Sequence, residues 1–198
     1  MMLNEVTAVP DAALPLAEFR DHLRLGTGFS DTGAEDVALS AYLRAALAAI
    51  EGRTAKALMA RDFMLSLTEW RWGDMQTLPI APVRAVAALR LIDGAGGEVI
   101  APASGWRLVA DMARPRLEAR GAALPAIPTG GRVEIDFTAG FGPAWADLPV
   151  DLAQAVFLLA AQYYEFRHDG AGEGGALPFG VSALIERWRT VRMLGGRG

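Results

Sequence analysis

The sequence predicts an α+β fold in which N-terminal and C-terminal helices form a helical bundle and an antiparallel β-sheet is inserted between them. Apolar residues recur at helical spacing near both ends of the chain, whereas they alternate with polar residues in the middle. Runs of strands flanked by runs of helices favour this class over a doubly wound parallel sheet. The predicted parts are 1–61 (N-terminal arm and helices), 62–145 (β-rich insertion) and 146–198 (C-terminal helices).

The stretch 148–167 has the clearest helical pattern and is the predicted central helix. Its apolar stripe consists of Leu152, Val156, Leu159, Tyr163 and Phe166. The other sides are also largely apolar, so we expect cover on more than one side, with one face available to a neighbouring copy. Pro149 suits the start of a helix, and Asp151 places a negative charge near its positive end. The apolar run is too short to span a bilayer.

Two helices are predicted before the sheet. Residues 1–13 are predicted as an extended arm, and 15–24 as a short helix. Thr32 and Glu35 have capping-box spacing, which predicts the start of the second helix. Its expected apolar face consists of Val37, Leu39, Leu43, Leu47 and Ile50. Gly52 weakens the helix, so its end is expected between there and Ala60.

About six strands are predicted in the middle of the chain, forming one antiparallel sheet. They cover residues 63–68, 83–92, 99–100, 106–109, 116–119 and 132–138. The glycines around residues 93–97 indicate a hairpin. Phe63, Leu65 and Leu67 alternate with Met64, Ser66 and Thr68, and the alternation of the last strand predicts that Val133, Ile135 and Phe137 point inward. Glu134 and Asp136 are expected on the solvent face of the same strand.

The last part is predicted to be a glycine-rich loop followed by a helix. Four glycines between 169 and 175 predict a mobile loop, and Ser182 is a candidate cap of the final helix. That helix would carry Leu184, Ile185, Trp188 and Val191 on its inward side, followed by a frayed tail.

Composition limits the classes of function. The 198 residues carry a formal net charge of -4, which argues against broad nucleic-acid binding. The chain has no cysteine, which excludes disulfides, thiolate metal sites and cysteine nucleophiles. The N-terminus has no signal-peptide pattern, so we expect assembly in the cytoplasm.

No motif in the chain predicts catalysis, a cofactor or a metal. His22 and His168 are the only histidines, lie far apart, and are expected to be polar surface residues. The glycines of 170–175 lack the strand and the Lys-Ser/Thr that a phosphate-binding loop requires. We therefore expect no catalytic, cofactor-binding or metal-ligating residues.

Tryptophans and arginines are the candidate partner-binding residues. Trp70 and Trp72 flank Arg71 beside a polar turn, and tryptophan and arginine are enriched at binding hot spots. Near the C-terminus the candidates are Arg187, Trp188, Arg189 and Arg192. Core packing of the tryptophans, and solvation of arginines at a helix end, are the competing interpretations.

The ordered pattern resembles the head–tail connector, or adaptor, proteins of long-tailed phages, in the branch with a β insertion. The matching stretches are residues 19–25, 46–51 with Thr54, 57–58, 78–86, 93–94, 138–142 and 148–149, and the helix end at 164–167. The Ala- and Arg-rich sequence, with little Lys, also looks like the product of a high-GC bacterial genome. The chain is therefore similar to the adaptor of a gene transfer agent, a phage-like particle made by such bacteria, or to that of a prophage.

The resemblance implies a structural protein of a particle neck, without enzymatic activity. It would form a homo-oligomeric ring, usually a dodecamer, between the portal protein and a stopper or other tail-neck protein. Double-stranded DNA would pass through the ring without sequence-specific binding, and no membrane would be involved. Arg187 to Arg192 become candidate portal contacts, and the loops at Trp70 and 169–175 candidate contacts to neighbouring subunits or the tail side. The alternatives are a stopper or tail terminator, a ligand-binding α+β domain, or a small enzyme.

Overall fold

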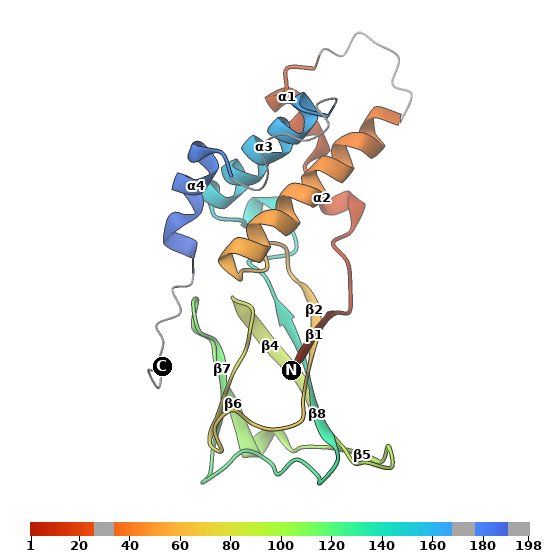
Figure 1. The fold of residues 1–198 in the computed structure, drawn as a ribbon, viewed down its shortest axis with the longest axis vertical. Coiled ribbons are helices and arrows are strands. Elements are labelled where there is room, and N and C mark those ends of the chain that lie inside the picture. Colours follow the sequence, from red (N-terminus) through yellow and green to blue (C-terminus); the bar gives the residue numbers. More distant parts are fainter. Residues whose placement is uncertain (26–33, 168–176, 190–198) are drawn as a thin grey trace. The chain divides into compact units, whose positions relative to one another are not determined.

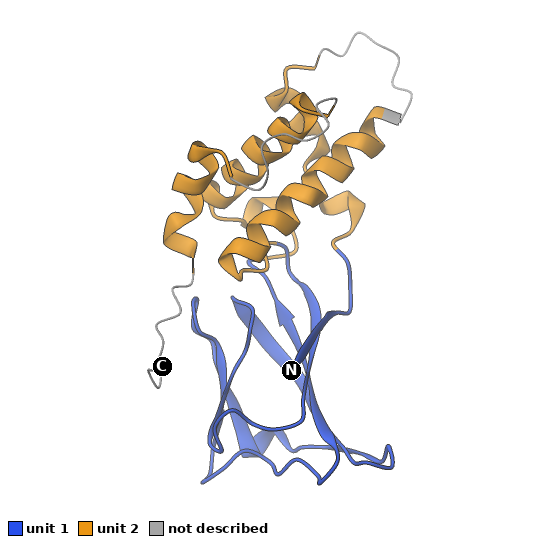
Figure 2. Ribbon diagram, viewed as in Figure 1, with its two compact units in different colours: residues 1–8, 59–141, 192–198 blue, residues 9–58, 142–191 orange. Residues whose placement is uncertain are grey.

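The computed structural model describes residues 1–25, 34–167 and 177–189, and it confirms an α+β fold with antiparallel sheets (Figure 1). The chain divides into two compact units (Figure 2). Among the described residues, unit 1 comprises 1–8 and 59–141, and unit 2 comprises 9–25, 34–58, 142–167 and 177–189.

A five-stranded antiparallel sheet is the framework of unit 1. In spatial order its strands are β1 (Met2–Glu5), β2 (Arg61–Leu67), β8 (Arg132–Ala139), β4 (Val83–Ile92) and β5 (Glu98–Ile100). The predicted extended arm therefore contributes an edge strand, which continues with Val6 N–H donating to Asp62 O at 2.8 Å.

The core face of this sheet agrees with the predicted alternation. In the register of β2 and β8, Phe63 lies opposite Phe137 and Leu65 opposite Ile135. All four side chains are at most 3% exposed, and the two phenylalanine rings stack at 5.7 Å. Burial of each such side chain contributes about 1.5–3 kcal/mol, so this pairing fixes the register.

A second sheet in unit 1 corrects the prediction of a single sheet. Its three antiparallel strands are β3 (Met75–Thr77), β7 (Arg116–Ala119) and β6 (Trp106–Val109). β3 has no apolar alternation, because its buried residue is Gln76. The Gln76 amide is satisfied locally: Oε1 accepts from Arg71 N–H at 2.9 Å and Nε2 donates to Thr77 O at 2.8 Å.

Unit 2 is helical. It contains α1 (Leu16–His22), α2 (Ala34–Thr54), α3 (Val150–Glu165) and α4 (Phe179–Ile185), with short 3-10 turns at Asp11–Ala13, Trp145–Asp147 and Glu186–Trp188. α2 packs on α3, and α3 packs on α4. Near the end of α2, Glu51 Oε1 accepts a hydrogen bond from the backbone N–H of Leu58 at 2.7 Å, which holds the segment after the helix against its last turn.

The core of unit 2 forms around α3, the predicted central helix. Leu152, Val156 and Leu159 are at most 2% exposed, as the stripe predicts, but Phe166 at its end is 53% exposed. Phe157 lies in an aromatic cluster with Trp145 and Phe19 at centroid distances of 5.2 and 5.7 Å. The ring of His22 joins this cluster 5.4 Å from Phe157, so His22 is a packed residue and not only a polar surface group.

Some predictions for the helices and their flanking segments are wrong, and others are untested. α4 begins at Phe179 after Pro178, and Ser182 lies inside the helix, because proline at this position starts the helix earlier. Val37 is 72% exposed, although the residues from Leu39 to Ile50 on the predicted face are buried. The predicted capping box at Thr32, the loop 169–175 and Val191 lie outside the described residues. No helix in the described ranges is long and apolar enough to cross a membrane.

Candidate functional site

The last described segment of the chain is held to the start of α3 by one carboxylate. Asp151 Oδ2 accepts a hydrogen bond from Trp188 Nε1 at 2.7 Å and pairs with Arg187 Nε at 2.7 Å. The Arg187 guanidinium also lies over the Trp188 ring, 4.8 Å from its centroid. Asp151 is the second residue of α3, where the carboxylate also favours the helix dipole. This contact, the Asp151 clamp, positions two of the candidate partner-binding residues.

Burial and hydrogen bonding have opposite effects on the pKa of the Asp151 carboxyl. Burial alone raises its pKa, because it disfavours the charged form. Hydrogen bonds from Trp188, Arg187 and the N–H of Leu152 outweigh burial, so the pKa of Asp151 lies below its ordinary value. Because the folded-state pKa is lowered, the ionised carboxylate stabilises the fold above about pH 4, and this stability is lost as the pH falls through the folded-state pKa.

Asp151→Asn tests the clamp. We expect it to destabilise the protein by about 1–2 kcal/mol at neutral pH, because a charged hydrogen-bond acceptor is lost while the Arg187 side chain is 68% exposed and screened by water. Thermal melting between pH 7 and pH 3 should show a smaller pH dependence in the variant. Glu186→Gln is the matched control, because Glu186 is 68% exposed in its pair with Arg189. Equal losses in both variants would contradict the clamp.

Arg189 lies beside a small pocket in unit 2. The pocket has a volume of about 210 Å³ and is lined by Arg53, Leu177, Ser182, Ile185, Glu186 and Arg189. The Arg189 side chain is 57% exposed and pairs with Glu186 at 3.1 Å. The pocket is smaller than the roughly 300–1,000 Å³ typical of small-molecule sites. Glu186, the ion-pair partner of Arg189, lines the same pocket.

Trp70 and Trp72 do not lie on a strand, because β2 ends at Leu67. Both tryptophans are half-buried. Trp70 Nε1 donates to the carbonyl of Pro125 at 2.8 Å, which fixes one ring to the neighbouring loop. Arg71 between them is exposed. The structure therefore places a partly exposed Trp-Arg-Trp segment on unit 1, whereas Arg187, Trp188 and Arg189 belong to unit 2.

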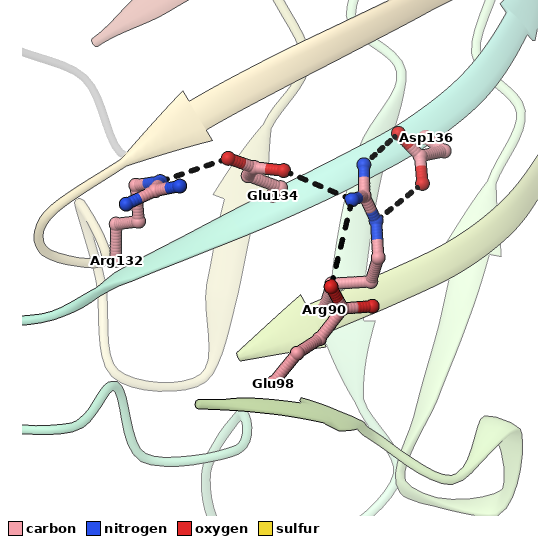
Figure 3. A network of polar contacts seen from close by, with 5 residues as sticks. All are labelled: Arg90, Glu98, Arg132, Glu134 and Asp136. Atoms are coloured by element: carbon pink, nitrogen blue, oxygen red, sulfur yellow. Dashed lines mark hydrogen bonds and ion pairs between the residues drawn. The ribbon is translucent and has the colours of Figure 1, made fainter. Parts of the chain in front are cut away.

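A network of five charges joins three strands of unit 1 (Figure 3). Arg90 binds Asp136 through two hydrogen bonds of 2.8 Å and pairs with Glu134 at 3.1 Å and Glu98 at 4.0 Å. Arg132 pairs with Glu134 at 2.8 Å. The hydrogen bond to Asp136 is the main reason that the pKa of Arg90 is raised. Each charge has an opposite partner, so the network holds strands together and leaves no reactive group.

This network corrects the prediction that Glu134 lies on a solvent face. Glu134 is only 8% exposed, because Arg90 on β4 lies directly opposite and covers it. Among the described residues, no group of three or more His, Cys, Asp or Glu side chains is arranged to hold a metal ion.

Of the predicted partner-binding residues, Arg187, Trp188 and Arg189 lie together at the turn that follows α4, in unit 2. Trp70 and Trp72 belong to unit 1. Arg192 lies outside the described residues. Sequence reasoning gave Asp151 only a helix-start role and missed its contact with Trp188. No local signal reveals a contact between residues 37 positions apart.

Comparison with solved structures identifies proteins similar to the whole chain. A neck of an empty gene transfer agent particle, computed with C6 symmetry, contains a chain that is 78% identical over 100% of both chains, with a TM-score of 0.91. A native gene transfer agent virion matches at 78% identity and a TM-score of 0.88, and a native neck computed with C12 symmetry at 73% and 0.86, each over 100% of both chains. No protein-family model matches, and the search of curated proteins found no match.

The identity and coverage of these matches are high enough to establish the family. They confirm the expected likeness to a structural neck protein of a phage-like particle, because chains in the virion and neck structures match this chain over its full length. The chain belongs to the family of gene transfer agent neck proteins.

Proposed function

We propose that this chain is the adaptor subunit of the neck, a structural protein without enzymatic activity that joins the portal protein to the stopper or another tail-neck protein. The observation that carries the proposal is the full-length match, at 73–78% identity, to chains in gene transfer agent particles and their necks. The order of helices and inserted strands that resembles adaptors supports the finer assignment. Assembly takes place in the bacterial cytoplasm, before the particle is complete.

The proposed assembly is a homo-oligomeric ring, a dodecamer. Its support is the symmetry of the related necks, one computed with C12 and one with C6, because a twelve-fold ring also contains six-fold symmetry. Cyclic rings are built from heterologous contacts, in which two different surfaces of each subunit meet.

The proposed ring extends the channel for double-stranded DNA without binding it specifically. The net charge of -4 supports passage without tight binding, because affinity for the phosphate backbone depends on neutralising cations. Five arginines of unit 1 are paired with carboxylates, namely Arg61, Arg90, Arg107, Arg116 and Arg132. A channel protein that holds DNA weakly lets it pass.

The C-terminal segment is proposed to dock on the portal. The Asp151 clamp holds Arg187 and Trp188. Arg189 and Arg192 are the proposed contacts to an acidic portal surface. Charge pairing across such a contact sets the register and rate of association more than the affinity. Trp70 and Trp72 are proposed contacts to a neighbouring subunit or a tail-side ring.

Complementation of producing cells that lack the chain tests this function. Without it we expect DNA-filled heads without tails, and the wild-type chain should restore complete particles. With Arg189→Ala/Arg192→Ala, the yield of tailed particles should be at least tenfold lower than with the wild-type chain. The isolated variant should keep its melting temperature, because the Asp151 clamp is intact. Arg107→Ala/Arg114→Ala removes two exposed arginines of unit 1 and should restore particles normally.

Tailed particles at normal yield without the chain would contradict the adaptor function. Normal yield from Arg189→Ala/Arg192→Ala would contradict only the portal contact.

A further inference from the structure

The five-stranded sheet of unit 1 ends in two edge strands. β1 pairs with β2 and β5 pairs with β4, and within the described residues neither has a strand partner on its outer side. An unpaired strand edge presents a row of backbone N–H and C=O groups that can bind another strand.

Both edges expose apolar side chains. On β1, Met2 is 58% exposed and Leu3 37%; on β5, Val99 is 64% exposed and Ile100 65%. Successive residues of a strand point to opposite faces. Leu3 lies opposite the buried Leu65, so Leu3 belongs to the core face and Met2 to the other face. Each edge therefore presents one apolar side chain on each face of the sheet.

The usual protection of strand edges is weak here. Neither β1 nor β5 contains lysine or proline. Each contains one glutamate, and both glutamates pair with arginines of their own sheet: Glu5 with Arg61 at 3.0 Å and Glu98 with Arg90 at 4.0 Å. These acidic groups are therefore partly neutralised within the subunit and oppose a neighbouring strand less than free carboxylates would.

We propose that the two edges meet between adjacent copies of this chain, with β5 of one protomer beside β1 of the next. The inference rests on the proposed ring. β1 and β5 are different surfaces at opposite edges of one sheet, which is what a heterologous contact requires. Pairing one edge with the other leaves no edge unpaired when the ring closes, whereas β1–β1 or β5–β5 contacts would stop at a dimer.

The topology also fixes the relative direction of the meeting strands. All four pairings in the sheet are antiparallel, so the first and fifth strands point the same way. Cyclic symmetry keeps the direction of every strand along the ring axis. β5 and the β1 of the next protomer therefore run parallel, with Met2 and Ile100 as the apolar residues at the junction.

Cross-linking tests this junction, because the chain has no cysteine of its own. Particles are assembled in producing cells with Met2→Cys/Ile100→Cys, purified, and treated with a short bis-maleimide. We expect a ladder of covalent oligomers reaching the full ring. A mixture of Met2→Cys and Ile100→Cys single variants should stop at dimers, because each chain then has one thiol. Met2→Cys/Met112→Cys is the control and should give no ladder, because Met112 is 51% exposed but lies away from the β5 edge in the chain.

Complete particles without a ladder would overturn the inference and leave the proposed function intact, whereas wild-type necks without a ring of this chain would overturn the function itself.

Charge variants give an independent result. Met2→Lys/Ile100→Lys should lower particle yield at least tenfold through like-charge repulsion, and Met2→Lys/Ile100→Glu should restore it. Equal yields from the two charge variants would also contradict the junction.

Discussion

Val156→Asp is expected to abolish folding. Val156 is fully buried on α3, among the helices of unit 2. A carboxylate there loses its hydration without gaining a partner, which costs several kcal/mol, and the packing of the valine is lost as well. The total stability of a folded protein is only about 5–15 kcal/mol. The variant should therefore accumulate in the insoluble fraction and show no cooperative melting by circular dichroism.

Val150→Asp is the matched control, because it makes the same change on the same helix. Val150 is 85% exposed and is the first residue of α3, where a negative charge favours the helix dipole. We expect an unchanged or slightly higher melting temperature. A soluble Val156→Asp protein that melts like the wild type would contradict the assignment of the central helix face.

Gly140→Ala is expected to have the second largest effect. Gly140 follows β8 with a φ of 132°, a conformation that side chains strongly disfavour. A Cβ at this position would lie 2.4 Å from the Cα of Ala60 and 2.5 Å from its nitrogen, and neither backbone atom can rotate away. Strain and overlap together cost roughly 3 kcal/mol or more, which lowers the melting temperature by about 6–12 °C in a chain of this size.

Gly105→Ala is the control for this substitution. No atom lies within 4 Å of a Cβ built on Gly105. The change should alter stability by less than about 0.5 kcal/mol in thermal melting. Equal melting temperatures for Gly140→Ala and the wild type would show that the chain does not approach Ala60 as described.

Elements whose burial follows a strict period could be predicted from the sequence. β2, β8 and α3 bury apolar residues at regular spacing, and their faces were predicted with few errors. β3 could not be found, because its buried residue is the polar Gln76. β1 shows no alternation, because Met2 and Leu3 are both exposed at a sheet edge. Its pairing depends on a strand about 60 residues away along the chain.

The candidate site shows the same limit. Tryptophan and arginine content identified Arg187, Trp188 and Arg189, but the residue that holds two of them is Asp151, on another helix. Glu134 was expected in solvent because its strand alternates, whereas its environment is set by Arg90 on the neighbouring strand. Composition and spacing indicate which residue types are present, and only the tertiary pairing shows which charges are covered.

Electron microscopy of native particles tests the proposal that this chain forms the ring next to the portal. An epitope inserted at the exposed turn around Met112 would be bound by an antibody fragment, and the neck reconstructed with the label. We expect twelve labels in a single ring that contacts the portal. Labels on the capsid, along the tail, or in a ring separated from the portal by another protein would contradict it.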